Sequence, residues 1–187
     1  MKLAVIFPGI GYHTDKPLLY YGKKTARELG YDIAEAPYGN FEKNIKGSAK
    51  KMEEAFLSAR RQAEKLLEDI DFRQYERIVF ISKSVGTAVA ASYAADHHIQ
   101  AEHIYYTPVT ASFQFMKSCG EQRGMVFHGT ADPWADTADI TKGCRERELP
   151  LYTIQKADHS LETGDVLTDI KNLCKIMEQT KTFLEKS

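Results

Sequence analysis

The sequence predicts an α/β protein, a three-layer α/β/α sandwich built around a mostly parallel six-stranded sheet. Short apolar runs alternate along the chain with longer segments whose apolar residues recur at helical spacing. The clearest run is apolar at every position, which is typical of a strand buried on both faces of a parallel sheet. Alternating strands and helices join through right-handed crossovers, which place helices on both faces of such a sheet.

The strands are predicted from apolar runs that end near turn residues. The first run, LAVIF at residues 3–7, stops at Pro8 and Gly9, as a strand buried in a parallel sheet would. Shorter runs of the same kind recur along the chain. In order, the predicted strands cover residues 3–7, 31–36, 77–81, 102–106, 125–128 and 151–154.

The helices are predicted from apolar residues at three- and four-residue steps. The clearest stripe follows Ser48, a suitable N-cap, and runs from Met52 to Ile70. Pro17 suits the first turn of the first helix, and Gly30 ends it. The predicted helices cover residues 17–29, 48–70, 84–97 and 166–184, and the last has an apolar face of Val166, Leu167, Ile170, Leu173, Cys174, Met177 and Leu184.

Length and composition indicate an ordinary globular protein. The 187 residues contain no repeat or linker, so we expect a single domain over residues 1–187. A formal net charge of -1 gives no reason to expect a nucleic-acid or membrane-surface partner, and no segment is long enough to span a membrane. Cys119, Cys144 and Cys174 are odd in number and form no Cys-x-x-Cys pair, so we expect a cytoplasmic protein without disulfides or a zinc site. Nothing in the sequence predicts an oligomeric state.

A serine stands where the third predicted strand meets a helix, in the segment IVFISKSVGT at residues 78–87. Ser84 is flanked two residues away by the small residues Ser82 and Gly86. This segment resembles the nucleophile elbow of the α/β-hydrolase family, usually G-x-S-x-G, in which a strained turn exposes the serine hydroxyl at the sheet edge. One alternative is a chance Ser-x-Ser-x-Gly at such a turn. Another is Ser82 as nucleophile, which is weaker because Ser82 falls within the strand and lacks a glycine two residues later.

An acid and a base are predicted in the loops after the last two strands. In MVFHGTADPW at residues 125–134, Asp132 stands where α/β-hydrolases carry the aspartate that orients the catalytic histidine. Asp132 would equally suit a turn or helix cap before proline, and Asp136 is a reserve candidate for the acid. In TIQKADHSLE at residues 153–162, His159 stands where the family carries its general base.

These candidates agree in order and in context. Ser84, Asp132 and His159 follow separate predicted strands in the chain order that this family uses. The resemblance covers essentially the whole chain and implies a minimal α/β-hydrolase fold with these residues as its catalytic triad. Only residues 107–123 separate the fourth and fifth strands, where the family inserts its lid, so no cap domain is expected.

The resemblance also implies an oxyanion hole made of two backbone N–H groups. One should belong to Val85, directly after the nucleophile, and the other to Ile10 in the loop after the first strand. The phenylalanine at position 113 could line an acyl pocket or simply pack a short helix on the sheet. The candidate substrate-binding residues are Gly11, which is also the second choice for the oxyanion hole, Tyr12, His13 and Phe113.

We therefore expect a serine hydrolase that cleaves a carboxylic ester or thioester of a small or exposed acyl substrate through an acyl-enzyme. Neither a metal nor an organic cofactor is expected. The open alternatives are an acyltransferase, a non-catalytic hydrolase-like binding protein, and a nucleotide-binding protein of Rossmann or flavodoxin type. The last is disfavoured because the loop with Gly9 and Gly11 has Thr14 where a third glycine would stand.

Overall fold

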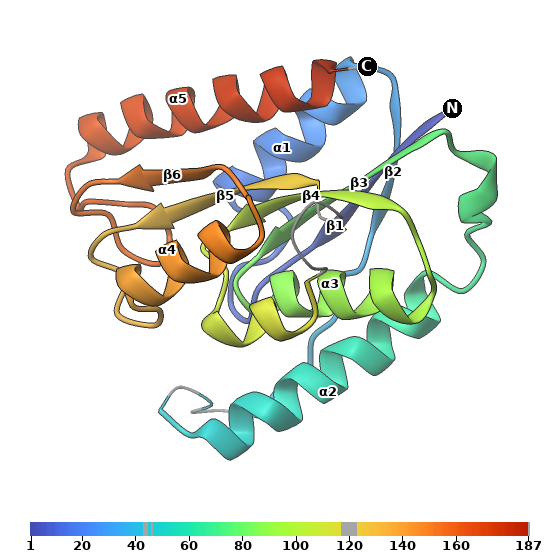
Figure 1. Cartoon of the computed structure of the whole chain (residues 1–187), viewed down its shortest axis with the longest axis horizontal. Coiled ribbons are helices and arrows are strands. Elements are labelled where there is room, and N and C mark those ends of the chain that lie inside the picture. The colour runs from blue at the N-terminus through green and yellow to red at the C-terminus, as the bar shows by residue number, and fades with distance from the viewer. Residues whose placement is uncertain (43–44, 46, 117–122, 187) are drawn as a thin grey trace.

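The computed structural model describes residues 1–42, 45, 47–116 and 123–186. Their strands form one six-stranded sheet in the order β2-β1-β3-β4-β5-β6, and every pair is parallel. Figure 1 shows α1 and α5 on one face of this sheet and α2, α3 and α4 on the other. The predicted three-layer sandwich is therefore confirmed.

The strands lie where the apolar runs predict them, within two residues at each end. The largest difference is in the third strand, which continues through Ser82 and Lys83 because both still pair with the neighbouring strand, Lys83 opposite Tyr106. The six strands are β1 (Lys2–Phe7), β2 (Tyr31–Glu35), β3 (Arg77–Lys83), β4 (Ala101–Tyr106), β5 (Gly124–Gly129) and β6 (Leu151–Ile154).

Four of the helices were predicted and one was not. The side chain of Ser48 caps the second helix by accepting a hydrogen bond from the Lys51 N–H at 3.3 Å. The unpredicted helix, α4, buries only Ile140, Gly143 and Cys144, so its apolar periodicity is weak. The helices are α1 (Pro17–Glu28), α2 (Ala49–Leu66), α3 (Val85–Asp96), α4 (Thr137–Glu146) and α5 (Val166–Glu185), with short 3-10 helices η1 (Phe72–Gln74) and η2 (Thr110–Gln114).

Both faces of the sheet are buried, as continuous apolar strands require. Ala4 and Ile6 of β1 join the core beneath α1 and α5, whereas Leu3, Val5 and Phe7 join the core beneath α2 and α3. Successive side chains of one strand therefore serve opposite layers. The carboxyl ends of all six strands meet at one edge, where the candidate site lies.

The apolar face predicted for the last helix is only partly buried. Val166, Leu167 and Ile170, in its first turns, are 70%, 69% and 58% exposed. The buried residues of α5 lie in its C-terminal half, where the Thr180 and Tyr106 hydroxyl oxygens lie 2.7 Å apart. The helix therefore continues at its N-terminal end beyond the part that the sheet and α1 cover (Figure 1).

Two features bear on the expectations about membranes and cysteines. None of the helices in the described ranges combines the length and apolar character that a membrane span requires. Cys144 is a buried free thiol and Cys174 an exposed one. Cys119 lies outside the described residues.

Candidate active site

Ser84 occupies a strained turn between β3 and α3. Its backbone has φ 55° and ψ -126°, outside the ordinary regions for a residue with a side chain. The turn brings the start of α3 close to the end of β1. A Cβ atom on Gly86 would lie only 2.3 Å from the Pro8 carbonyl oxygen. Only glycine fits that contact, which gives the small residue after the serine a physical reason.

Ser82, the weaker nucleophile candidate, points elsewhere. It is fully buried in β3, and its hydroxyl donates to the carbonyl oxygen of Ile104 on the neighbouring strand at 3.3 Å. The two serines of the motif thus have separate environments, and only Ser84 lines the pocket described below.

Ser84, His159 and Asp132 form a chain of hydrogen bonds at the carboxyl edge of the sheet. The Ser84 Oγ lies 2.7 Å from Nε2 of His159, and Nδ1 of His159 lies 2.7 Å from Oδ2 of Asp132. An ionised carboxylate only accepts hydrogen bonds, so Nδ1 carries the imidazole proton. Nε2 is then free to accept the proton of the Ser84 hydroxyl, which is the arrangement of a nucleophile and its general base.

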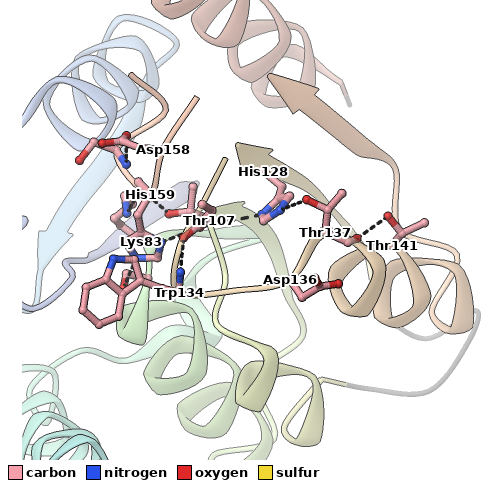
Figure 2. Close-up of polar contacts among 12 residues, drawn as sticks. Lys83, Thr107, His128, Trp134, Asp136, Thr137, Thr141, Asp158 and His159 are labelled. Carbon is pink, nitrogen blue, oxygen red and sulfur yellow. Dashed lines mark hydrogen bonds and ion pairs between the residues drawn. The ribbon is translucent and has the colours of Figure 1, made fainter. Parts of the chain in front are cut away.

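Asp132 is held as a buried acceptor. Its side chain has no exposed surface, and its second oxygen, Oδ1, accepts the backbone N–H of Trp134 at 2.9 Å. The reserve candidate Asp136 has a different place, because its Oδ1 caps α4 by accepting the Ala138 N–H at 2.7 Å. In Figure 2 Asp136 lies at the start of that helix, apart from His159.

The electrostatic environment favours an ionised aspartate and a neutral histidine. Burial alone would raise the pKa of Asp132, but the hydrogen bond and charge of His159 hold that pKa below its ordinary value. Burial lowers the pKa of His159, and the charge of Lys83 lowers it further, against the opposing effect of Asp132. A neutral imidazole is the form that can accept a proton.

A pocket of about 520 Å³ opens in front of Ser84. It is lined by the loop after β1, by the start of α2, and by the loops that carry Trp134 and His159. The lining combines apolar side chains with polar ones, among them the carboxylates of Glu42 and Asp158. Its lining residues are Ile10, Gly11, Tyr12, Glu42, Ile45, Met52, Lys83, Ser84, Val85, Val109, Trp134, Asp158, His159 and Ser160.

The candidate oxyanion-hole residues lie in this pocket beside Ser84. Val85 is the first residue of α3, so its N–H has no partner within the helix. Gly9 and Tyr12 bond to each other's backbone at 3.0 and 3.2 Å, a pairing that does not use the N–H of Ile10. Gly11 completes that turn with φ 75°.

Two predicted substrate-binding residues do not line the pocket. His13 is exposed, and its Nδ1 accepts the Asp15 N–H at 3.3 Å. Phe113, in η2, is buried against α4, where a Cβ atom on Gly143 would lie 2.6 Å from its ring. The guanidinium of Arg147 lies 5.2 Å from the centre of the same ring. The structure therefore places Phe113 in packing against α4 and not in the wall of this pocket.

The structure adds residues that the sequence did not single out. Lys83 lies in the nucleophile motif itself, directly before Ser84, but the motif assigns it no role. It is 1% exposed, and its Nζ donates to the backbone oxygen of His159 at 2.7 Å. Figure 2 shows it beneath the loop that carries His159. A lysine between a predicted buried strand and the candidate nucleophile is itself a signal, because lysine is almost never fully buried without partners.

A second histidine faces the same carboxylate from β5. His128 Nδ1 lies 4.0 Å from Oδ2 of Asp132, and its Nε2 lies 3.0 Å from the hydroxyl of Thr137. Burial lowers its pKa, as it does for His159. Within the described part of the chain, no three His, Cys, Asp or Glu side chains are grouped so that they could hold a metal ion.

Comparisons with known proteins agree on the fold. No family model and no curated protein sequence matches the chain. Among solved structures, an alpha-beta serine hydrolase homologue from Coxiella burnetii superposes with TM-score 0.69 at 13% identity, covering 97% of this chain and 84% of that one. Est1E from Butyrivibrio proteoclasticus, bound to ferulic acid, gives TM-score 0.68 at 14% identity over 98% and 88%.

A serine hydrolase without a lid from Xanthomonas campestris is also similar, with TM-score 0.63 at 15% identity over 100% of this chain and 84% of that one. The strand order by itself does not identify the fold, because flavodoxin-like proteins share much of it. The superpositions on these three structures each extend over nearly the whole chain. The chain therefore has the α/β-hydrolase fold, and its described residues include no cap domain.

Proposed function

We propose that this protein is a serine hydrolase that cleaves carboxylic esters or thioesters through an acyl-enzyme. The observation that carries the proposal is the continuous hydrogen-bonded chain from Ser84 through His159 to the buried Asp132. A serine on a strained turn, a neutral imidazole and an orienting carboxylate are the parts that acyl transfer to serine requires.

In the proposed reaction, Ser84 Oγ attacks the carbonyl carbon of the ester while His159 Nε2 takes the hydroxyl proton. Asp132 keeps Nδ1 protonated and stabilises the imidazolium that forms. The N–H groups of Val85 and Ile10 are the proposed donors to the oxyanion. His159 then gives its proton to the leaving alcohol or thiol. A water molecule next attacks the acyl-enzyme carbonyl while His159 takes its proton, and His159 returns that proton to Ser84 Oγ as the acid leaves.

The pocket favours a substrate with a modest apolar group at the reacting carbonyl. Ile10, Ile45, Met52, Val109 and Trp134 supply apolar walls around about 520 Å³, enough for a short aliphatic or a single aromatic acyl group. The segment 107–123 is too short for a cap of several helices, so larger molecules could present their acyl group to an open site. Est1E, of similar fold, holds the aromatic acid ferulic acid.

The proposal is tested by labelling with a fluorophosphonate probe and by hydrolysis of p-nitrophenyl acetate and butyrate. The wild-type protein should be labelled and active, whereas Ser84→Ala should lose both properties. Ser82→Ala is the matched control, because it removes a hydroxyl two residues away that bonds to the Ile104 carbonyl oxygen of β4, and it should still be labelled. Equal labelling of wild type and Ser84→Ala, or no labelling of wild type, would refute the proposal.

A further inference from the structure

Lys83 is a charged side chain buried directly beside the proposed nucleophile. It is 1% exposed, although removing an ammonium group from water is costly unless the group finds partners. Two partners are present. The Nζ donates to the backbone oxygen of His159 at 2.7 Å, and it lies 4.9 Å from the centre of the Tyr12 ring. The lysine is therefore built into the loop that carries the proposed base.

The same backbone oxygen has a second donor. The hydroxyl of Thr107, directly after β4, donates to the oxygen of His159 at 3.0 Å. Thr107 is itself fully buried and has φ 43°, so it is held in an uncommon backbone conformation. Side chains from the ends of two adjacent strands, β3 and β4, thus fix the main chain at the residue whose imidazole joins Ser84 to Asp132.

We propose that Lys83 is a positioning residue that anchors the backbone of His159 and supplies a positive charge favouring the neutral, proton-accepting imidazole. This role rests on the proposed hydrolase function and deepens it. Lys83 is not assigned as the base, because the Ser84 hydroxyl is already paired with His159 Nε2 and the lysine Nζ bonds to a main-chain oxygen.

The burial of Lys83 makes this effect strongest on the acid side of neutrality. Burial lowers the pKa of Lys83 to about 7, against the opposing charges of Asp132 and Asp158. The lysine is therefore cationic at the acidic pH values where His159 would otherwise gain a proton. A neighbouring cation disfavours the imidazolium and extends the neutral form to lower pH.

The remaining groups around the imidazole act differently. Tyr12, beneath the ammonium, stays neutral because burial raises its pKa to about 12. Asp132, and more weakly Asp158, raise the pKa of His159 and oppose the lysine. His128 faces Asp132 from β5, and since burial lowers its pKa it is a weaker source of positive charge than Lys83.

The test compares Lys83→Met with Thr107→Val, which removes the other donor to the same oxygen without changing charge. The second-order rate of fluorophosphonate labelling is measured against pH for both variants and for wild type. Both variants should lose about 5- to 20-fold in rate at the optimum, because a misplaced base costs proximity. The acid limb of the profile is the fall in rate as His159 gains a proton. Only Lys83→Met should move the midpoint of this acid limb to higher pH, by roughly half a pH unit or more.

An unchanged rate and acid limb in Lys83→Met would overturn the proposal. An equal limb shift in both variants would also overturn it, because the effect would then come from the lost hydrogen bond and not from the charge. If Lys83→Met does not fold, Lys83→Gln replaces it, with thermal melting and circular dichroism as checks. Absence of wild-type labelling refutes the hydrolase function instead.

A measurement that needs no turnover distinguishes failure of the Lys83 proposal from failure of the proposed hydrolase function. NMR titration of the imidazole carbons follows His159 directly, with His159→Gln used to assign its signal against that of His128. The midpoint for His159 should be higher in Lys83→Met than in wild type, whether or not an ester is hydrolysed. An identical midpoint would remove the electrostatic role of Lys83 independently of any assay of activity.

Discussion

Ala131 donates its backbone N–H to the carbonyl oxygen of Ala157 at 2.9 Å, which ties the loop after β5 to the loop after β6. These loops carry Asp132 and His159 respectively. A second backbone hydrogen bond, from the Thr130 N–H to the carbonyl oxygen of Ile154 at the end of β6, joins the same two segments at 3.0 Å. The distance between the carboxylate and the imidazole is therefore set by main-chain contacts as well as by their own hydrogen bond.

Gly129→Ala should separate these two loops. A Cβ atom at Gly129 would lie 2.3 Å from the Ala157 carbonyl oxygen and 2.5 Å from that of Asp158, and neither backbone oxygen can move without carrying His159 with it. We expect ester hydrolysis to fall at least about tenfold and the free energy of unfolding to fall by about 2 kcal/mol. Gly39→Ala, where nothing lies within 4 Å, is the control and should behave as wild type. Wild-type kinetics and melting in Gly129→Ala would contradict this account.

Asp132→Asn should abolish most activity while leaving the fold intact. An amide at this position can donate to Nδ1 of His159, which selects the tautomer that cannot accept the Ser84 proton. We expect kcat for p-nitrophenyl acetate to fall by about a thousandfold or more. Asp136→Asn is the matched change, since asparagine also caps helices well, and its kcat should stay within about twofold of wild type. Comparable losses in both variants would place the orienting acid elsewhere.

The acid limb of the activity profile should lie below pH 6.5, the ordinary pKa of histidine. Burial and then the charge of Lys83 lower the pKa of His159, so the neutral base persists to lower pH than in an exposed histidine. The midpoint is obtained from kcat/KM against pH, which reports ionisations of the free protein. A midpoint above 6.5 would mean that the Asp132 interaction outweighs burial.

The sequence was sufficient for most of the fold because the strands of this sheet are buried on both faces. Val79 and Phe80 are fully buried on opposite faces, so the run is apolar throughout and easily recognised. Helix α4 was not predicted because it is positioned by packing against a distant segment and has only a weak apolar pattern of its own. Gly143 sits within it to make room for the ring of Phe113, a contact between segments 30 residues apart that no local pattern can display.

The candidate site also contains residues that the sequence could predict and one that it could not. Chain order and strand context predicted Ser84, Asp132 and His159, and the structure places His159 within hydrogen-bonding distance of both other side chains. Lys83 was missed although it stands inside the same motif. Its importance depends on an oxygen 76 positions along the chain and on the Tyr12 ring, and both come near it only after the sheet has formed.

The buried lysine should leave a signature in the pH dependence of stability. Its pKa falls from 10.5 in an exposed setting to about 7 in the folded protein, so between these values the unfolded chain binds the extra proton. Stability contributed by this group therefore rises with pH from about 7 towards 10, by up to about 1.4 kcal/mol per pH unit. Below pH 7 both states are protonated and the full cost of burial remains.

Lys83→Met removes that proton and should be more stable than wild type at pH 7, because methionine fills the same space without a charge. The advantage should shrink by roughly 2 to 3 kcal/mol between pH 7 and about pH 9.5, because over this range the wild-type lysine loses its proton in the folded protein while the unfolded chain still holds it. Urea unfolding of both proteins at the two pH values measures the difference, and the other titrating groups cancel in the comparison. Parallel behaviour at both pH values would mean that Lys83 keeps its charge in the folded protein, stabilised by the His159 oxygen, Asp132 and Asp158 more strongly than its burial opposes it.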